Sequence, residues 1–132
     1  MESVIKGILL IERDIEEKEF MGRKDIEYLI VVGDHKIGNE AFCGCTNLQT
    51  VIIDTKDVGM SCFKDCKNLT TVVFWQQPYV LVRSYAFYGC RRLEFVYTQN
   101  DDALDISCLG NCYLKDAPKL ILEEKENENP VL

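Results

Sequence analysis

Apolar positions recur along this chain in a fixed order that returns every 21 to 24 residues. Each copy opens with an aliphatic residue, continues with a small residue, phenylalanine, cysteine and leucine, and ends on two apolar positions separated by one residue. The copies open at Ile15, Ile37, Val58 and Val82, and the first of them is degenerate. A repeat of this length predicts a solenoid, because one unit is too small to bury its apolar face and must stack on its neighbours.

The end of each copy predicts a β-strand. Apolar positions alternate there with variable ones, and successive strand side chains point to opposite faces of a sheet. Strands are therefore predicted over residues 26–31, 48–53, 69–74 and 93–98. Because equivalent strands of stacked coils lie side by side, we expect one parallel sheet on the concave side. Its inward side chains are predicted to be Leu29, Val31, Val51, Ile53, Val72, Phe74 and Val96.

The other half of each copy is too short for a long helix. We expect a short helical turn there, on the convex side of the solenoid. The phenylalanines of these segments occupy equivalent positions, so they are expected to form a buried ladder of Phe20, Phe42, Phe63 and Phe87.

Both ends of a solenoid need caps, since the core is otherwise exposed. Counting back one repeat from Val31 reaches Leu9, which predicts an N-terminal capping strand within residues 4–11. A blurred final repeat aligns Cys108 with Ala86 and Leu120 with Val96.

The framework residues resemble a known repeat. The order apolar, glycine, alanine-phenylalanine, cysteine, leucine and two alternating apolar positions is similar to the BspA-type leucine-rich repeat, which occurs in surface and interaction proteins. One copy matches every framework position, with Ile37, Gly38, Ala41, Phe42, Cys45, Leu48, Val51 and Ile53. The next copy has Cys62 in place of alanine, and the fourth has Arg83 in place of glycine. The resemblance implies an α/β leucine-rich-repeat solenoid and a binding role in general.

Length and charge narrow the classes of protein. At 132 residues, one solenoid domain over 1–122 is expected, with its cap in 1–14 and its repeats over about 15–122. The acidic segment 123–132 is expected to be a flexible tail. A net charge of −7 argues against nucleic acid and against insertion into or adsorption on an anionic membrane. The N-terminal apolar run is short for a signal peptide, so we expect a cytoplasmic protein, or a surface or secreted one if a leader precedes this sequence.

Seven cysteines raise the question of metal binding. The repeat register favours a different explanation, because equivalent side chains in a stack point in parallel, whereas zinc needs sulfurs that converge at about 2.3 Å. We expect no metal and no other cofactor, with the framework cysteines buried as small apolar residues and Cys43 the most exposed. No catalytic residue is predicted, since His35 lies in a turn and no nucleophile motif surrounds Cys43.

The outward strand positions are the candidate functional site. An exposed strand face is ordinarily polar, yet most of these positions are apolar or aromatic, and aromatic residues dominate binding hot spots. We expect a protein partner of unspecified identity to bind there. The alternatives are a homodimer through the same concave face and coverage of this face by the chain's own tail or N-terminal segment. Trp75 and Tyr97 are expected to lie side by side on adjacent strands, offset by one strand and two residues. The candidate residues are Tyr28, Ile30, Val32, Ile52, Val73, Trp75, Phe95 and Tyr97.

Overall fold

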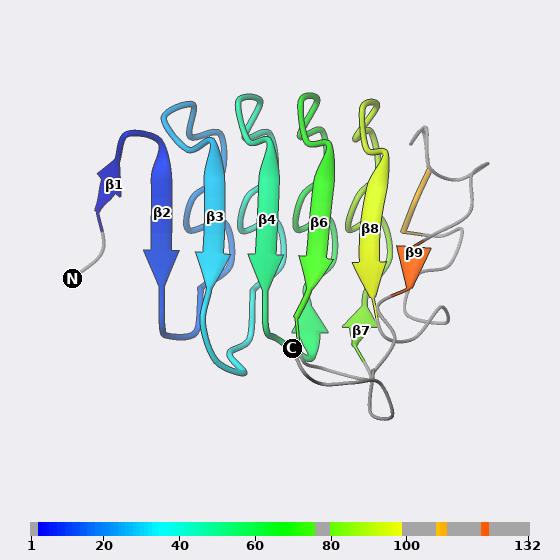
Figure 1. The fold of residues 1–132 in the computed structure, drawn as a ribbon, viewed down its shortest axis with the longest axis horizontal. Coiled ribbons are helices and arrows are strands. Elements are labelled where there is room, and N and C mark those ends of the chain that lie inside the picture. Colours follow the sequence, from blue (N-terminus) through cyan, green and yellow to red (C-terminus); the bar gives the residue numbers. More distant parts are fainter. Residues whose placement is uncertain (1–2, 76–79, 99–107, 111–119, 122–132) are drawn as a thin grey trace, which may run out of the picture.

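The computed structural model describes residues 3–75, 80–98, 108–110 and 120–121, which form a stack of coils with one broad sheet (Figure 1). In the described part of the chain this sheet has seven strands in the order β1-β2-β3-β4-β6-β8-β9. The strands are β1 (Val4–Ile5), β2 (Ile8–Ile11), β3 (Tyr28–Val31), β4 (Thr50–Ile53), β6 (Thr71–Phe74), β8 (Phe95–Thr98) and β9 (Leu120–Ile121).

From β2 to β9 each strand runs parallel to the next, as the repeat predicts. Leu29 pairs with Val51, Val51 with Val72, and Val72 with Val96, so equivalent residues of successive coils form straight rows. All the side chains predicted to point inward are buried, which confirms the predicted core face of the sheet. The strands begin two residues later than predicted, because the leucines still belong to turns; the Leu48 amide, for example, donates to the Cys45 carbonyl at 3.2 Å.

A second, shorter ladder closes the coils along the lower edge in Figure 1. There β5 (Asp57–Val58) pairs in parallel with β7 (Leu81–Val82). Single bridges continue this ladder from Val58 to Ile37 and from Ile37 to Ile15. The aliphatic residues that open the repeats are therefore stacked on one another and seal the core at this edge.

The predicted phenylalanine ladder is confirmed. Neighbouring rings are nearly parallel, with centroid separations of 5.2 Å for Phe20–Phe42, 5.5 Å for Phe42–Phe63 and 5.5 Å for Phe63–Phe87. Phe42, Phe63 and Phe87 are fully buried. The ladder fills the space between the sheet and the turns and extends through four coils.

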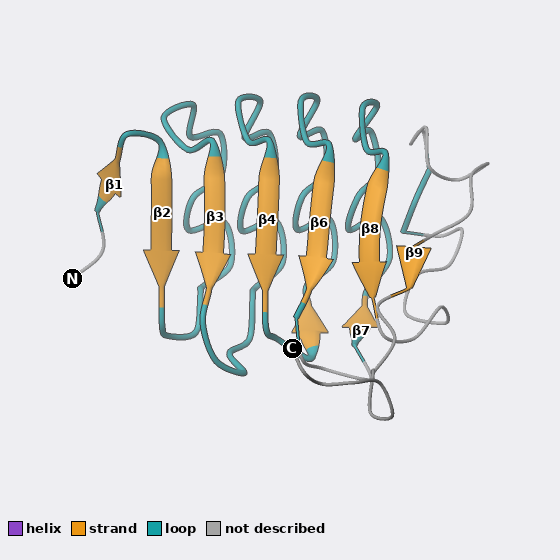
Figure 2. Cartoon of the chain, in the orientation of Figure 1, coloured by secondary structure: helices purple, strands orange, loops and turns teal. Residues whose placement is uncertain are grey.

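The predicted helical turns are wrong: the described residues contain strands and loops but no helix (Figure 2). A helix would direct each amide to a carbonyl four residues earlier in its own segment. Here alternate amides leave the coil instead, since Phe42 donates to Cys62 at 2.9 Å and Gly44 donates to Lys64 at 2.8 Å. The amides between them form turns within the coil, as in the 3.2 Å bond from Cys43 to Glu40. Bonding between coils therefore replaces the helix.

Left-handed backbone at two positions in each coil prevents a helix in any case. In the second coil these positions are Glu40, with a φ of 57°, and Gly44, with a φ of 75°. A right-handed helix requires negative φ at every residue. The equivalent residues in the other coils also have positive φ, and they are Lys18, Ser61 and Tyr85 at the first position and Gly22, Asp65 and Gly89 at the second.

The two ends differ from the predicted register. Within the predicted capping segment, β2 aligns Leu9 with Leu29 and Ile11 with Val31, so the predicted match of Leu9 to Val31 is wrong by two residues. The chain enters β2 through a hairpin whose antiparallel strand is β1.

The final repeat begins in the predicted register. The Phe87 amide donates to the Cys108 carbonyl at 2.9 Å, as Phe63 does to Ala86, which confirms that Cys108 is equivalent to Ala86. In β9, Leu120 pairs with Tyr97 rather than with Val96, so the predicted register of this strand is wrong by one residue. The segment 123–132, predicted to be a flexible tail, lies outside the described residues.

Candidate functional site: the outer face of the sheet

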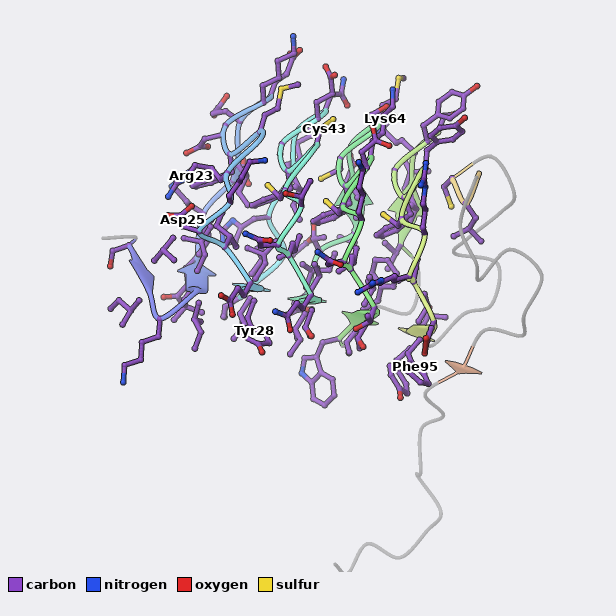
Figure 3. The ribbon with its side chains drawn as sticks, turned by 90° about the horizontal axis from the view of Figure 1, so that it is seen from above. Arg23, Asp25, Tyr28, Cys43, Lys64 and Phe95 are labelled. Carbon is purple, nitrogen blue, oxygen red and sulfur yellow. The ribbon has the colours of Figure 1, made fainter. Side chains whose placement is uncertain are left out.

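We call the side of the main sheet that points away from the core the outer face. All eight candidate residues lie on it, because they alternate with the buried core residues or follow the last of them directly. Tyr28, Val32, Trp75 and Phe95 are exposed, and Ile30, Ile52, Val73 and Tyr97 are half-buried. Figure 3 shows Tyr28 and Phe95 on the side opposite to Cys43 and Lys64.

Parallel register arranges these side chains in rows across the strands. The middle row, Ile30–Ile52–Val73–Tyr97, is apolar or aromatic throughout. The upper row, Tyr28–Thr50–Thr71–Phe95, has an aromatic residue at each end and two threonines between them. Val32, Asp54 and Trp75 follow β3, β4 and β6 directly and form the lower row.

Trp75 and Tyr97 are not directly opposite each other. Tyr97 pairs with Val73, so Trp75 lies two residues further along its strand. The ring that stacks on Tyr97 belongs to Phe95 of the same strand, at a centroid separation of 6.5 Å. The pair therefore lies diagonally across β6 and β8, with the predicted offset of one strand and two residues.

At its N-terminal end the outer face extends beyond the predicted residues. Ile8 and Leu10 of β2 are exposed next to Tyr28 and Ile30, and Ile5 of β1 is exposed next to Ile8. Their signal was present, since Leu9 and Ile11 are inward and the residues between them must point outward. The sequence predicts this segment only as a cap, yet its outward apolar residues also belong to the candidate face.

The outer face has a hollow of about 300 Å³ between β2 and β4. It is lined by Ile8, Tyr28, Leu29, Ile30, Thr50 and Ile52. The hollow arises because Thr50 is much smaller than the tyrosine beside it in the upper row. Its lining is almost entirely apolar, so water within it makes few hydrogen bonds and is readily displaced by an apolar side chain.

Charge at the lower margin of the outer face is of one sign, whereas Lys6 lines a hollow with Ile5, Ile8 and Leu10 at the N-terminal end of this face. On the described strands from β2 to β8 and the residues that directly follow them, its charged side chains are Glu12 and Asp54, and none is basic. Basic residues such as the half-buried Lys64 and the exposed Arg91 lie elsewhere on the coils. The outer face is therefore an apolar surface with an acidic lower margin.

The buried cysteines make contacts between neighbouring coils. Three equivalent thiols each lie close to the carbonyl oxygen of the phenylalanine in the preceding coil, at 3.2 Å for Cys45–Phe20, 3.2 Å for Cys66–Phe42 and 3.1 Å for Cys90–Phe63. The thiols donate in parallel, as the repeat register predicts. Among the described residues no group of three or more histidine, cysteine or carboxylate side chains is placed to hold a metal ion. The equivalent Cys112 lies outside the described residues.

Burial holds these thiols in the protonated form. It raises the pKa of Cys45 to about 11 from an ordinary value of 9.0, and it raises the pKa of Cys66 well above that value. Burial also raises the pKa of the half-exposed Cys43, with a further contribution from the carboxylates of Glu40 and Asp65. A thiolate nucleophile is therefore disfavoured at each of these positions.

Thiol labelling under native conditions should follow this order. With an alkylating reagent at neutral pH we expect Cys43 to react first, and Cys66 and Cys90 to react only as fast as the protein unfolds. Mass spectrometry of digested time points measures each rate, and labelling in denaturant gives the intrinsic reference. Rapid native labelling of Cys66 would contradict the buried thiol row.

The single histidine takes part in a polar contact at the lower edge. His35 Nδ1 lies 3.4 Å from Asp14 Oδ1, and the same oxygen accepts a 2.9 Å hydrogen bond from the Lys36 amide. Thr55, which is buried, donates its hydroxyl to the His35 carbonyl. These contacts join successive turns, which gives the histidine a structural environment.

Comparison with known families agrees with the geometry. The model of the BspA type leucine rich repeat region matches residues 13–120 in six copies, which is more copies than the sequence analysis distinguished. Comparison with curated proteins and with solved structures found no match to the chain. In the part of the chain that the structure describes, no helix has the length and apolar character needed to cross a membrane.

Proposed function

Because the chain belongs to the BspA-type leucine-rich-repeat family, we propose that it is a protein-interaction module that binds another polypeptide through the outer face of its sheet. The observation that carries this proposal is the unbroken apolar middle row, flanked by the exposed side chains of Tyr28, Phe95 and Trp75. Aromatic side chains on a rigid sheet supply contact area at little entropic cost. The proposal includes no catalytic step, since the thiols are held protonated and His35 lies in a structural contact.

Area favours a different chain over a second copy as the partner. With strands about 4.8 Å apart and same-face side chains about 6.8 Å apart, the outer face of five strands covers roughly 500 Å². A stable interface buries about 800 Å² on each partner. Two copies that meet through this face bury no more than its own area, whereas a different chain can also contact the loops around the face.

Charge favours a different chain as well. Each copy has a net charge of −7, so two copies repel each other as they approach. We therefore expect a monomer by sedimentation over a wide range of protein concentration. A dimer that Trp75→Asp dissociates would replace this proposal with self-association.

A charge placed on the outer face should abolish partner binding. Trp75→Asp and Tyr97→Asp each introduce a carboxylate that contact would desolvate, so we expect affinity to fall by at least about tenfold. The melting temperature should change little, because Trp75 is 52% exposed and Tyr97 lies outside the buried core. The measurement is capture of a partner from an extract of the source cells, followed by calorimetry with that partner purified.

The matched control is Lys64→Asp, a change to aspartate on the opposite side of the solenoid (Figure 3). It should leave binding unchanged. Normal binding by both outer-face variants together with loss of binding in the control would place the site on the turn side and reject the outer face.

A further inference from the structure

We propose that the outer face receives a cationic amphipathic helix, seated along the strands between Tyr28 and Phe95. This inference rests on the proposed function and specifies the chemistry of the partner. Three observations carry it: the spacing of the aromatic residues in the upper row, the saturation of the sheet backbone, and the sign of the charge on the lower margin.

The upper row forms a seat of the right width. Tyr28, Thr50, Thr71 and Phe95 are direct neighbours across four parallel strands. Three strand spacings separate the two aromatic residues by about 14 Å, and a helix with its side chains is about 10–12 Å across. Both aromatic residues are exposed, at 39% and 42%, while the threonines between them are half-buried, so the row is raised at its ends and low in its centre.

The floor of the seat is apolar where a helix would press on it. Below the threonines lie Ile52 and Val73, which are direct neighbours on β4 and β6. The apolar hollow beside Thr50 and Ile52 offers room of about 300 Å³ for a larger side chain. A helix uses side chains at positions i, i+3, i+4 and i+7 as such anchors. Two turns of helix match the length of a four-residue strand, at about 11 and 13 Å respectively.

A helix suits this face better than an extended segment does. An extended segment that binds by strand addition needs an open sheet edge, where free backbone groups give the affinity. On the outer face the central strands are paired on both sides, β4 with β3 and β6, and β6 with β4 and β8. The surface therefore offers side chains and no backbone ladder. A helix satisfies its own backbone and needs only side-chain contacts.

The lower margin selects the charge of the partner. Asp54 and Glu12 supply negative charge there, and the described outer face of β2 to β8 has no basic side chain. Trp75 follows β6 in the position next to Asp54, since its amide donates to Ile53 at 2.8 Å. A lysine or arginine of the partner can lie over the indole and reach the carboxylate, which combines a cation–π contact with an ion pair. An anionic helix would be repelled at the same place.

The test uses two synthetic helical peptides of 14 residues with the same leucine stripe and either lysine or glutamate at the remaining positions. Trp75 is the single tryptophan of the protein, so its fluorescence reports binding directly. We expect a saturable blue shift with the lysine peptide and binding at least about tenfold weaker with the glutamate peptide at low salt. The difference should narrow as the salt concentration rises.

Two variants separate docking from general attraction between a cation and an acidic protein. Ile52→Asp adds negative charge to the floor: non-specific attraction would strengthen, whereas docking on the floor predicts at least about tenfold weaker binding of the lysine peptide. The double variant Glu12→Lys with Asp54→Lys should reverse the preference and favour the glutamate peptide. Melting curves of both variants verify that the fold is intact.

Equal affinity for the two peptides, or tighter binding of the lysine peptide by Ile52→Asp, would overturn the proposal. If a natural partner is lost in Trp75→Asp while neither peptide binds the wild-type protein, the proposed function stands and this inference is rejected. If neither peptide binds the wild-type protein and Trp75→Asp leaves the affinity for the natural partner unchanged, the proposed function and this inference are both rejected.

Discussion

Replacing Phe63 by alanine is expected to lower the free energy of unfolding by about 3–5 kcal/mol. Phe63 is fully buried and lies between Phe42 and Phe87, at centroid separations of 5.5 Å on both sides. The change removes ring contacts on two sides and leaves a cavity that the rigid coils cannot close. The total free energy of unfolding of a single domain is about 5–15 kcal/mol, so this loss is a large share of the total stability. Chemical denaturation followed by circular dichroism measures it.

The control for this prediction is Phe20→Ala. Phe20 belongs to the same ladder, but it stacks on one phenylalanine, Phe42, and is 8% exposed, with the Arg23 guanidinium 5.7 Å from its ring centroid. Its removal should therefore cost clearly less. If the two variants were equally stable, the ladder would not be a continuous structural element.

Gly59→Ala is expected to destabilise the protein by about 3 kcal/mol or more, at the upper end of the usual cost of overpacking. A Cβ at this position would lie 2.6 Å from the Gly38 carbonyl carbon and 2.7 Å from the Asn39 amide nitrogen. Both atoms belong to the backbone of the neighbouring coil, so no side chain can move aside. The coils must separate, which weakens the hydrogen bonds and ring contacts between them. The melting temperature and the denaturation midpoint report the loss.

Gly22→Ala provides the comparison. Gly22 has a φ of 75°, and a Cβ there would meet nothing within 4 Å. The cost is then only that of left-handed backbone in a residue with a side chain, about 1–2 kcal/mol. Equal losses at Gly22 and Gly59 would mean that the close approach of the coils contributes nothing to stability.

The turns show why the sequence predicted the wrong local structure on the convex side. A segment such as 38–45 contains residues that favour helix or turn about equally, and its length permits one helical turn. The choice depends on the neighbouring coil, whose carbonyls accept the amides of Phe42 and Gly44. A partner that is about 20 residues away in the sequence and adjacent only after stacking cannot be recognised from local propensity.

The sequence likewise predicts some features of the candidate site and leaves others open. Alternation places Ile52 and Val73 on the outer face without any knowledge of the structure. It does not decide that Leu10 extends the middle row, since that depends on the first coil being two residues shorter than the next one. Alternation and repeat length together do decide that Tyr97 lies opposite Val73, because the copies that open at Val58 and Val82 are 24 residues apart, and the register of β6 and β8 confirms this pairing.

The sequence by itself determined the repeat, the parallel sheet, the inward residues and the phenylalanine ladder. These properties depend on which residues are apolar and how far apart they are, because a repeated pattern must bury equivalent positions in equivalent places. Only the tertiary structure decided the turn conformation, the registers at both ends, and the carbonyl partners of Cys45 and Cys66. Each of these depends on hydrogen bonds between coils, whose geometry exists only once the coils are stacked.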